Sequence, residues 1–128
     1  MITVQLCGEF DFSHKDLSIR NYEKSITTDC WMKFHINEDL FFDDWICPLE
    51  MYYQYLDWKK NYDNGLVQSF EYTSDDNGEN PILSFRQINN MWIAYSVLTK
   101  RNSDFITLHD VLNFFELFSS QLMQHQND

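Results

Sequence analysis

The sequence predicts a single α+β domain over residues 1–128, with two helices packed on an antiparallel sheet of about five strands. The chain has 128 residues, 44% of them hydrophobic, which is enough for one core and too little for two full domains. Apolar residues alternate with polar ones in five segments and recur every three or four residues in two others. These segments follow one another in the order ββαβββα, which is typical of a two-layer α+β plan.

The first two predicted strands lie in the N-terminal third. In residues 2–12 most apolar side chains occupy even positions, and in residues 26–36 they do so again. Alternation of this kind is typical of a strand with one buried face. We expect the polar residues 13–25 between them to form a connection.

The first predicted helix runs from about residue 45 to residue 62, after an acidic connection. Pro48 suits a first helical turn, and Asp43 or Asp44 could cap it. The run 63–65, Asp-Asn-Gly, is typical of a helix end. Apolar residues recur along this segment at helical spacing: Trp45, Leu49, Tyr52, Tyr53 and Leu56.

The C-terminal half predicts a meander and a closing helix. Strands are expected at residues 66–73, 82–88 and 91–98, because turn-forming residues separate them, with a two-residue hairpin at 89–90. Residues 107–110 resemble a capping box, with Asp in the place of the usual Glu. An amphipathic helix follows that box to the end of the chain.

Net charge and composition exclude several classes of function. The formal net charge is −11, from 20 acids against 9 Lys and Arg, so binding to a nucleic acid backbone or to an anionic membrane is not expected. Residues 1–7 lack the basic and apolar stretches of a signal peptide, and no apolar run is long enough for a membrane span. Three widely spaced cysteines without a Cys-x-x-Cys pair predict reduced thiols. We therefore expect a cytoplasmic protein.

The negative charge is concentrated in the middle of the chain. Residues 37–79 hold eleven acids and two bases, so they carry −9 of the −11. Such residues can simply be solvated turn and cap residues, but an unbalanced acidic segment also attracts a basic partner. The candidate contacts form two clusters: Glu38, Asp39, Asp43 and Asp44, and then Asp75, Asp76 and Glu79.

Tryptophans beside these acids are candidate anchors, because binding energy at interfaces concentrates in Trp, Tyr and Arg. Trp31 occupies the polar face of its predicted strand, and Trp58 lies off the main apolar stripe of the first helix. These two are expected to be partly exposed. Trp45 and Trp92 are expected in the core or at its edge.

The motifs of common enzyme classes are missing. The sequence has no glycine-rich phosphate loop, no nucleophile elbow and no His-Glu-x-x-His. The four histidines are scattered, and the acidic run 75–79 departs from a calcium loop in its glycine and its final ligand. We therefore expect no enzyme, no metal site and no cofactor. A small enzyme that uses a pair of carboxylates is the least favoured alternative.

Residues 70–97 carry a family resemblance. The runs 70–76 (FEYTSDD), 79–85 (ENPILSF) and 92–97 (WIAYSV) resemble small acidic immunity proteins of bacterial polymorphic toxin systems, including contact-dependent growth inhibition. The resemblance implies a single α+β domain that binds a cognate toxin domain and blocks it. The resemblance does not identify any particular residue of this chain as a binding residue.

Charge and resemblance together predict an immunity protein that neutralises a toxin domain, such as a nuclease with a basic surface, through an acidic face. The alternative is an acidic adaptor, or a regulatory domain that mimics DNA, binding another basic protein. Both hypotheses require an acidic surface that attracts a basic partner. Only the identity of the partner separates them.

Overall fold

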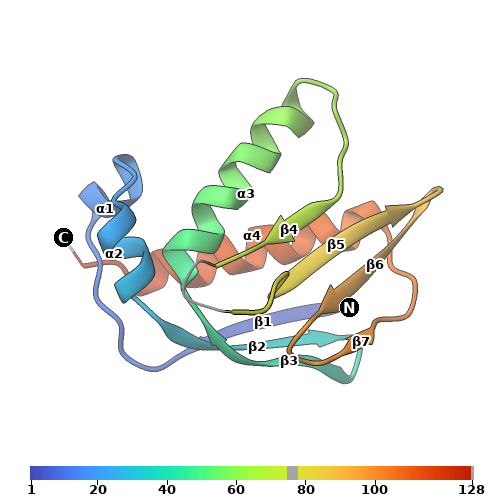
Figure 1. Cartoon of the computed structure of the whole chain (residues 1–128), viewed down its shortest axis with the longest axis horizontal. Coiled ribbons are helices and arrows are strands. Elements are labelled where there is room, and N and C mark those ends of the chain that lie inside the picture. The colour runs from blue at the N-terminus through green and yellow to red at the C-terminus, as the bar shows by residue number, and fades with distance from the viewer. Residues whose placement is uncertain (75–77, 128) are drawn as a thin grey trace.

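The structure is a computed structural model that describes residues 1–74 and 78–127. The strands form two antiparallel sheets with the orders β1-β2-β3 and β4-β5-β6-β7 (Figure 1). The elements are β1 (Ile2–Cys7), α1 (His14–Ser18), α2 (Tyr22–Thr27), β2 (Cys30–Ile36), β3 (Asp39–Ile46), α3 (Pro48–Asp63), β4 (Phe70–Tyr72), β5 (Leu83–Ile88), β6 (Met91–Ser96), β7 (Arg101–Asn102) and α4 (Leu108–Gln124).

The predicted α+β class is confirmed, but the strands divide between two sheets instead of forming one. The first sheet also contains β3, a segment that sequence analysis assigned to an acidic connection. Its apolar residues Phe42 and Ile46 pair with Phe34 and Cys30 of β2. Pairing and burial thus outweigh the low strand preference of the acids. Asn37, at φ 57°, occupies the left-handed region in the turn between β2 and β3.

The alternation predicted for the first two strands is confirmed. Ile2, Val4 and Leu6 are buried and pair with the buried even residues of β2. β1 nevertheless ends at Cys7, where Gly8 has φ 98°. The predicted connection 13–25 forms the helix α1 and most of α2, and α2 continues to Thr27, so the second strand begins at Cys30 and not at residue 26 as predicted.

Helix α3 begins later than predicted. Its N-cap is Cys47, which makes no side-chain capping hydrogen bond, and Pro48 opens the first turn as expected. Asp43 and Asp44 are not caps, because they lie within β3. The predicted helix end at 63–65 is confirmed, and Gly65 there has φ 86°, in the left-handed region.

The predicted meander is confirmed as β4, β5 and β6, and β7 extends it by a fourth strand. The first strand is shorter than expected because residues 66–69 return along α3 instead. Leu66 N donates to Asn61 O at 2.9 Å, and Gln68 O accepts a hydrogen bond from α3. The chain thus joins its sheet only at Phe70.

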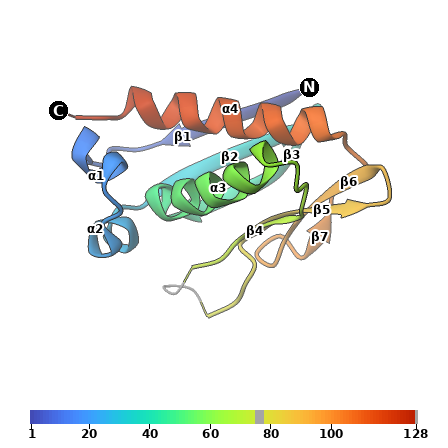
Figure 2. The same cartoon turned by 90° about the horizontal axis from the view of Figure 1, so that it is seen from above.

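Helix α4 joins the two sheets. The capping box is present, with Thr107 accepting from Asp110 N and Asp110 accepting from Thr107 N. Phe114 of α4 contacts Phe34 of β2 and Phe85 of β5, with ring centroids 4.6 and 5.0 Å apart. The core therefore lies between both sheets and the long helices (Figure 2).

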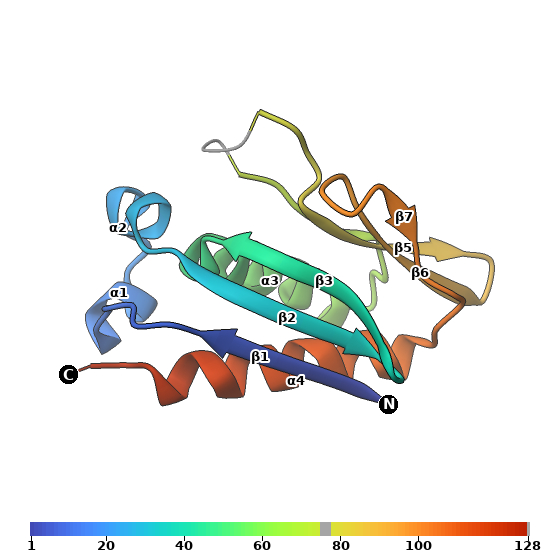
Figure 3. The ribbon, with the colours of Figure 1, turned by 90° about the horizontal axis from the view of Figure 1, so that it is seen from below.

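One face of the β1-β2-β3 sheet is uncovered. Both α3 and α4 lie behind this sheet when the molecule is viewed from below (Figure 3). Odd-numbered side chains of β2 point to this open side, and they are only half-buried. In the part of the chain that the structure describes, no helix is long and apolar enough to cross a membrane.

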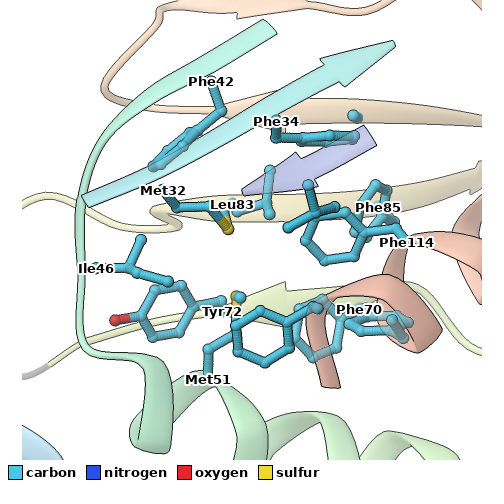
Figure 4. Packing of buried hydrophobic residues seen from close by; sticks show 14 of the residues in the cluster. Met32, Phe34, Phe42, Ile46, Met51, Phe70, Tyr72, Leu83, Phe85 and Phe114 are labelled. Atoms are coloured by element: carbon cyan, nitrogen blue, oxygen red, sulfur yellow. The ribbon is translucent and has the colours of Figure 1, made fainter. Parts of the chain in front are cut away.

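Tyr72 ties β4 to the start of α3. The residue is fully buried, and its ring lies near Ile46 with the hydroxyl pointing toward the β3–α3 junction (Figure 4). Its hydroxyl oxygen accepts from Cys47 N at 3.0 Å, and the hydroxyl contacts Glu50 Oε1 at 3.3 Å. Burial raises the pKa of this phenol well above its usual range.

We expect Tyr72→Phe to lower the free energy of unfolding by about 1–3 kcal/mol, because it removes a partner from buried polar groups. Tyr95→Phe is the matched control, since Tyr95 is half-buried and its hydroxyl has no hydrogen bond to a described residue. Urea denaturation of both variants measures the difference. Equal losses would show that the Tyr72 hydroxyl does not hold this junction.

Candidate partner-binding surface

The uncovered sheet face carries an aromatic and charged group of side chains that we call the β2–β3 surface: Trp31, Lys33, Asp43 and Trp45. Register places them directly, because Trp31 pairs with Trp45 and Lys33 pairs with Asp43 across the two strands. Cross-strand neighbours on one face lie about 5 Å apart. The four side chains therefore form a continuous patch.

The two tryptophans of this surface are held in place by each other and by a carboxylate. Their ring centroids are 5.3 Å apart with an interplanar angle of 82°, an edge-to-face arrangement. Trp31 Nε1 donates a hydrogen bond to Asp43 Oδ1. Trp45 remains 56% exposed. An ordered, exposed Trp of this kind offers a large apolar area that loses little entropy on binding.

The exposure predicted for Trp31 agrees with its half-buried position, but the predictions for two other tryptophans are wrong. Trp45, expected near the core, lies on the open face because its segment is a strand and not a helix. Trp58, expected to be exposed, is only 6% exposed. Its Nε1 donates to Gln68 O at 2.6 Å, and its ring packs on Phe115. Trp58 is thus a core residue and no partner contact.

The first predicted acidic cluster is divided along β3. A strand rises about 3.3 Å per residue, so Asp39 and Asp44 lie roughly 17 Å apart. Asp39 forms an ion pair with Arg101 at 3.0 Å, and Arg101 also donates to Leu40 O. Asp39 therefore connects β3 to β7, and Glu38 is exposed in the adjoining turn. Of the four acids, only Asp43 lies on the sheet face that carries the tryptophans, because Asp44 pairs with the buried Met32 and points to the other side of β3.

A pocket of about 190 Å³ opens next to Trp45, and we call it the β3 pocket. It lies between the end of β3 and the second sheet, and sequence analysis did not predict it. Asp29 was not a candidate, because its position beside β3 depends on the β2–β3 pairing. The lining residues are Asp29, Asp44, Trp45, Ile46, Cys47, Tyr72, Ser74, Ile82 and Leu98.

The second predicted acidic cluster is only partly described. Asp75 and Asp76 lie outside the described residues. Glu79 is exposed, and Ser74 lines the β3 pocket. The structure therefore does not test whether this cluster and the β2–β3 surface form one face.

Asp57 and Cys30, which lie outside this surface, have shifted pKa values. Arg20 donates to Asp57 Oδ2 at 3.0 Å, and this hydrogen bond lowers the pKa of the Asp57 carboxyl. Burial raises the pKa of the Cys30 thiol, so this cysteine is unreactive near neutral pH. Among residues 1–74 and 78–127, no three His, Cys, Asp or Glu side chains are grouped so that they could hold a metal ion.

Fold and surface together define a small α+β protein with an exposed aromatic patch on an open sheet face. The chain belongs to the family described as Domain of unknown function (DUF7878), whose model matches residues 8–127. No curated protein matches the chain. No solved structure matches it either.

Proposed function

We propose that the chain is an immunity protein that binds a cognate bacterial toxin domain through the β2–β3 surface and thereby neutralises it. The observation that carries this proposal is Trp45, which is 56% exposed, is ordered by Trp31 and lies on the same sheet face as Asp43. Tryptophans ringed by polar groups are the usual anchors of tight interfaces. The resemblance of residues 70–97 to immunity proteins supports the choice of partner.

The overall charge supports a basic partner. At −11, the chain attracts a cationic surface over the Debye length of about 8 Å at physiological salt. Attraction of this kind can accelerate association by about 10- to 1,000-fold. Fast capture suits an inhibitor that must reach a toxin before the toxin reaches its substrate.

The test is co-expression with the toxin domain encoded beside this chain. We expect the chain to restore growth and to co-purify with the toxin domain in equimolar amounts. A Trp45→Ala, Asp44→Asn variant is expected to lose protection, whereas Phe105→Ala, Asp104→Asn on the second sheet should retain it. Binding to a basic protein that is no toxin, without any protection, would instead support an adaptor.

Salt dependence provides a further prediction. Asp43→Asn with Asp44→Asn should slow association with the toxin domain several-fold at low salt and make the rate less sensitive to salt, because part of the steering charge is removed. The change to Asn keeps an acceptor for Trp31. Asp104→Asn with Glu116→Gln removes the same total charge from other exposed positions. Stopped-flow rates that fall equally in both double variants would contradict a localised acidic face.

A further inference from the structure

The β3 pocket has walls that suit an aliphatic chain. Ile46 comes from the end of β3, Ile82 precedes β5, and Leu98 follows β6. Trp45 is also among the lining residues, and its ring lies on the outer face of the sheet against Trp31. A cavity of roughly 150 Å³ can hold a benzene ring, so the 190 Å³ here admits a long side chain.

Two carboxylates give this pocket its charge. Asp29 makes no hydrogen bond or ion pair with any residue that the structure describes, and Asp44 accepts through Oδ1 from Trp45 N at 2.7 Å. None of the lining residues is a Lys, Arg or His. The carboxylate charges are therefore not neutralised inside the pocket, and a cation entering it would gain both attractions.

The nearby end of α3 does not reverse this preference. Cys47, the N-cap of α3, also lines the pocket, and a helix N-terminus carries about half a positive charge. Asp29 and Asp44 together carry two negative charges, so the local balance stays negative. Cys47 N is already hydrogen-bonded to the Tyr72 hydroxyl and is not available to an anion.

We propose that the β3 pocket receives an arginine side chain of the partner; this inference rests on the proposed function. The methylene groups would lie against Ile46, Ile82 and Leu98, and the guanidinium would bridge Asp29 and Asp44 beside Trp45. Arginine fits better than lysine because its planar fork donates to two acceptors at once. The aromatic patch and the pocket then act as adjoining halves of one interface.

A blocked amino acid tests the pocket without the toxin. Titration of the ¹⁵N-labelled chain with N-acetyl-arginine methylamide should shift the Trp45 indole N–H resonance and saturate with a millimolar Kd. Loss of a hydrogen bond to a charged group weakens binding about 10- to 100-fold. We therefore expect no saturable shift with the norleucine analogue, and at least about ten-fold weaker binding with the lysine analogue.

Matched variants of the chain complete the test. Asp29→Asn with Asp44→Asn should abolish the shift, whereas Asp43→Asn, which lies on the outer face, should retain it. The unchanged resonances of the buried Trp58 and Trp92 would show that the variants are folded. Equal shifts with arginine and lysine analogues, or persistence of the shift in the double variant, would overturn the pocket assignment.

The two proposals can fail separately. If the toxin domain binds but blocked arginine does not shift Trp45, the pocket assignment is wrong and the proposed function stands. If blocked arginine binds in the pocket but the neighbouring toxin domain does not bind, the pocket chemistry stands and the proposed function is wrong.

Discussion

Phe114→Ala is expected to lower the free energy of unfolding by about 3–5 kcal/mol, the usual loss for a buried phenylalanine. Phe114 is fully buried, and it contacts one phenylalanine from each sheet, Phe34 and Phe85. Its removal leaves a cavity where the two sheets and α4 meet. Such a loss is a large part of the roughly 5–15 kcal/mol that stabilises a domain of this kind.

Urea denaturation measures this loss against a control on the same helix. Met123 is 40% exposed near the end of α4, so Met123→Ala should change the free energy of unfolding by no more than about 0.5 kcal/mol. A loss below about 1 kcal/mol for Phe114→Ala would contradict the packing of α4 against both sheets.

Trp45→Ala is expected to weaken binding of the toxin domain by about 2–4 kcal/mol, or roughly 30- to 1,000-fold in Kd. The variant loses the exposed ring and its edge-to-face contact with Trp31. Stability should change little, because more than half of the Trp45 side chain is already in solvent.

The matched control for this prediction is Phe105→Ala. Phe105 is 61% exposed, similar to Trp45, but it lies between β7 and α4, away from the β2–β3 surface. Isothermal titration calorimetry should therefore give wild-type affinity for Phe105→Ala. The opposite result, with Phe105→Ala weak and Trp45→Ala normal, would place the interface on the second sheet.

The parts of the fold that were predicted correctly depend on local signals. The box at Thr107 and Asp110 fixed the start of α4, and the alternation in residues 2–6 fixed the buried face of β1. Such signals lie within a few residues and reflect hydrogen bonds that the segment makes with itself, or a face it buries.

The missed parts depend on partners distant in sequence. β3 contains three acids among eight residues, and only its pairing with β2 and the burial of Phe41 and Phe42 make it a strand. Because β3 was not predicted, Trp45 was expected at the start of a helix, whereas it lies at an exposed position of a strand. Trp58 was similarly misplaced, because the loop that covers it cannot be inferred from helical spacing.

The acidic candidate residues were also predicted correctly only where local sequence was enough. Sequence analysis located most of the negative charge in residues 37–79. It could not show which of these acids form ion pairs in the folded protein. Asp39 is engaged by Arg101, from a strand about sixty residues later, whereas Asp44 faces a pocket together with Asp29. The pocket exists only because both sheets approach the end of β3.

The four tryptophans provide the most direct test of the central claim that the β2–β3 surface binds the toxin domain. Trp31 and Trp45 lie on that surface, whereas Trp58 and Trp92 are buried. On titration of the ¹⁵N-labelled chain with the toxin domain, the indole N–H resonances of Trp31 and Trp45 should shift or broaden and those of Trp58 and Trp92 should stay in place. Complex formation that leaves the Trp31 and Trp45 resonances unchanged would contradict the account.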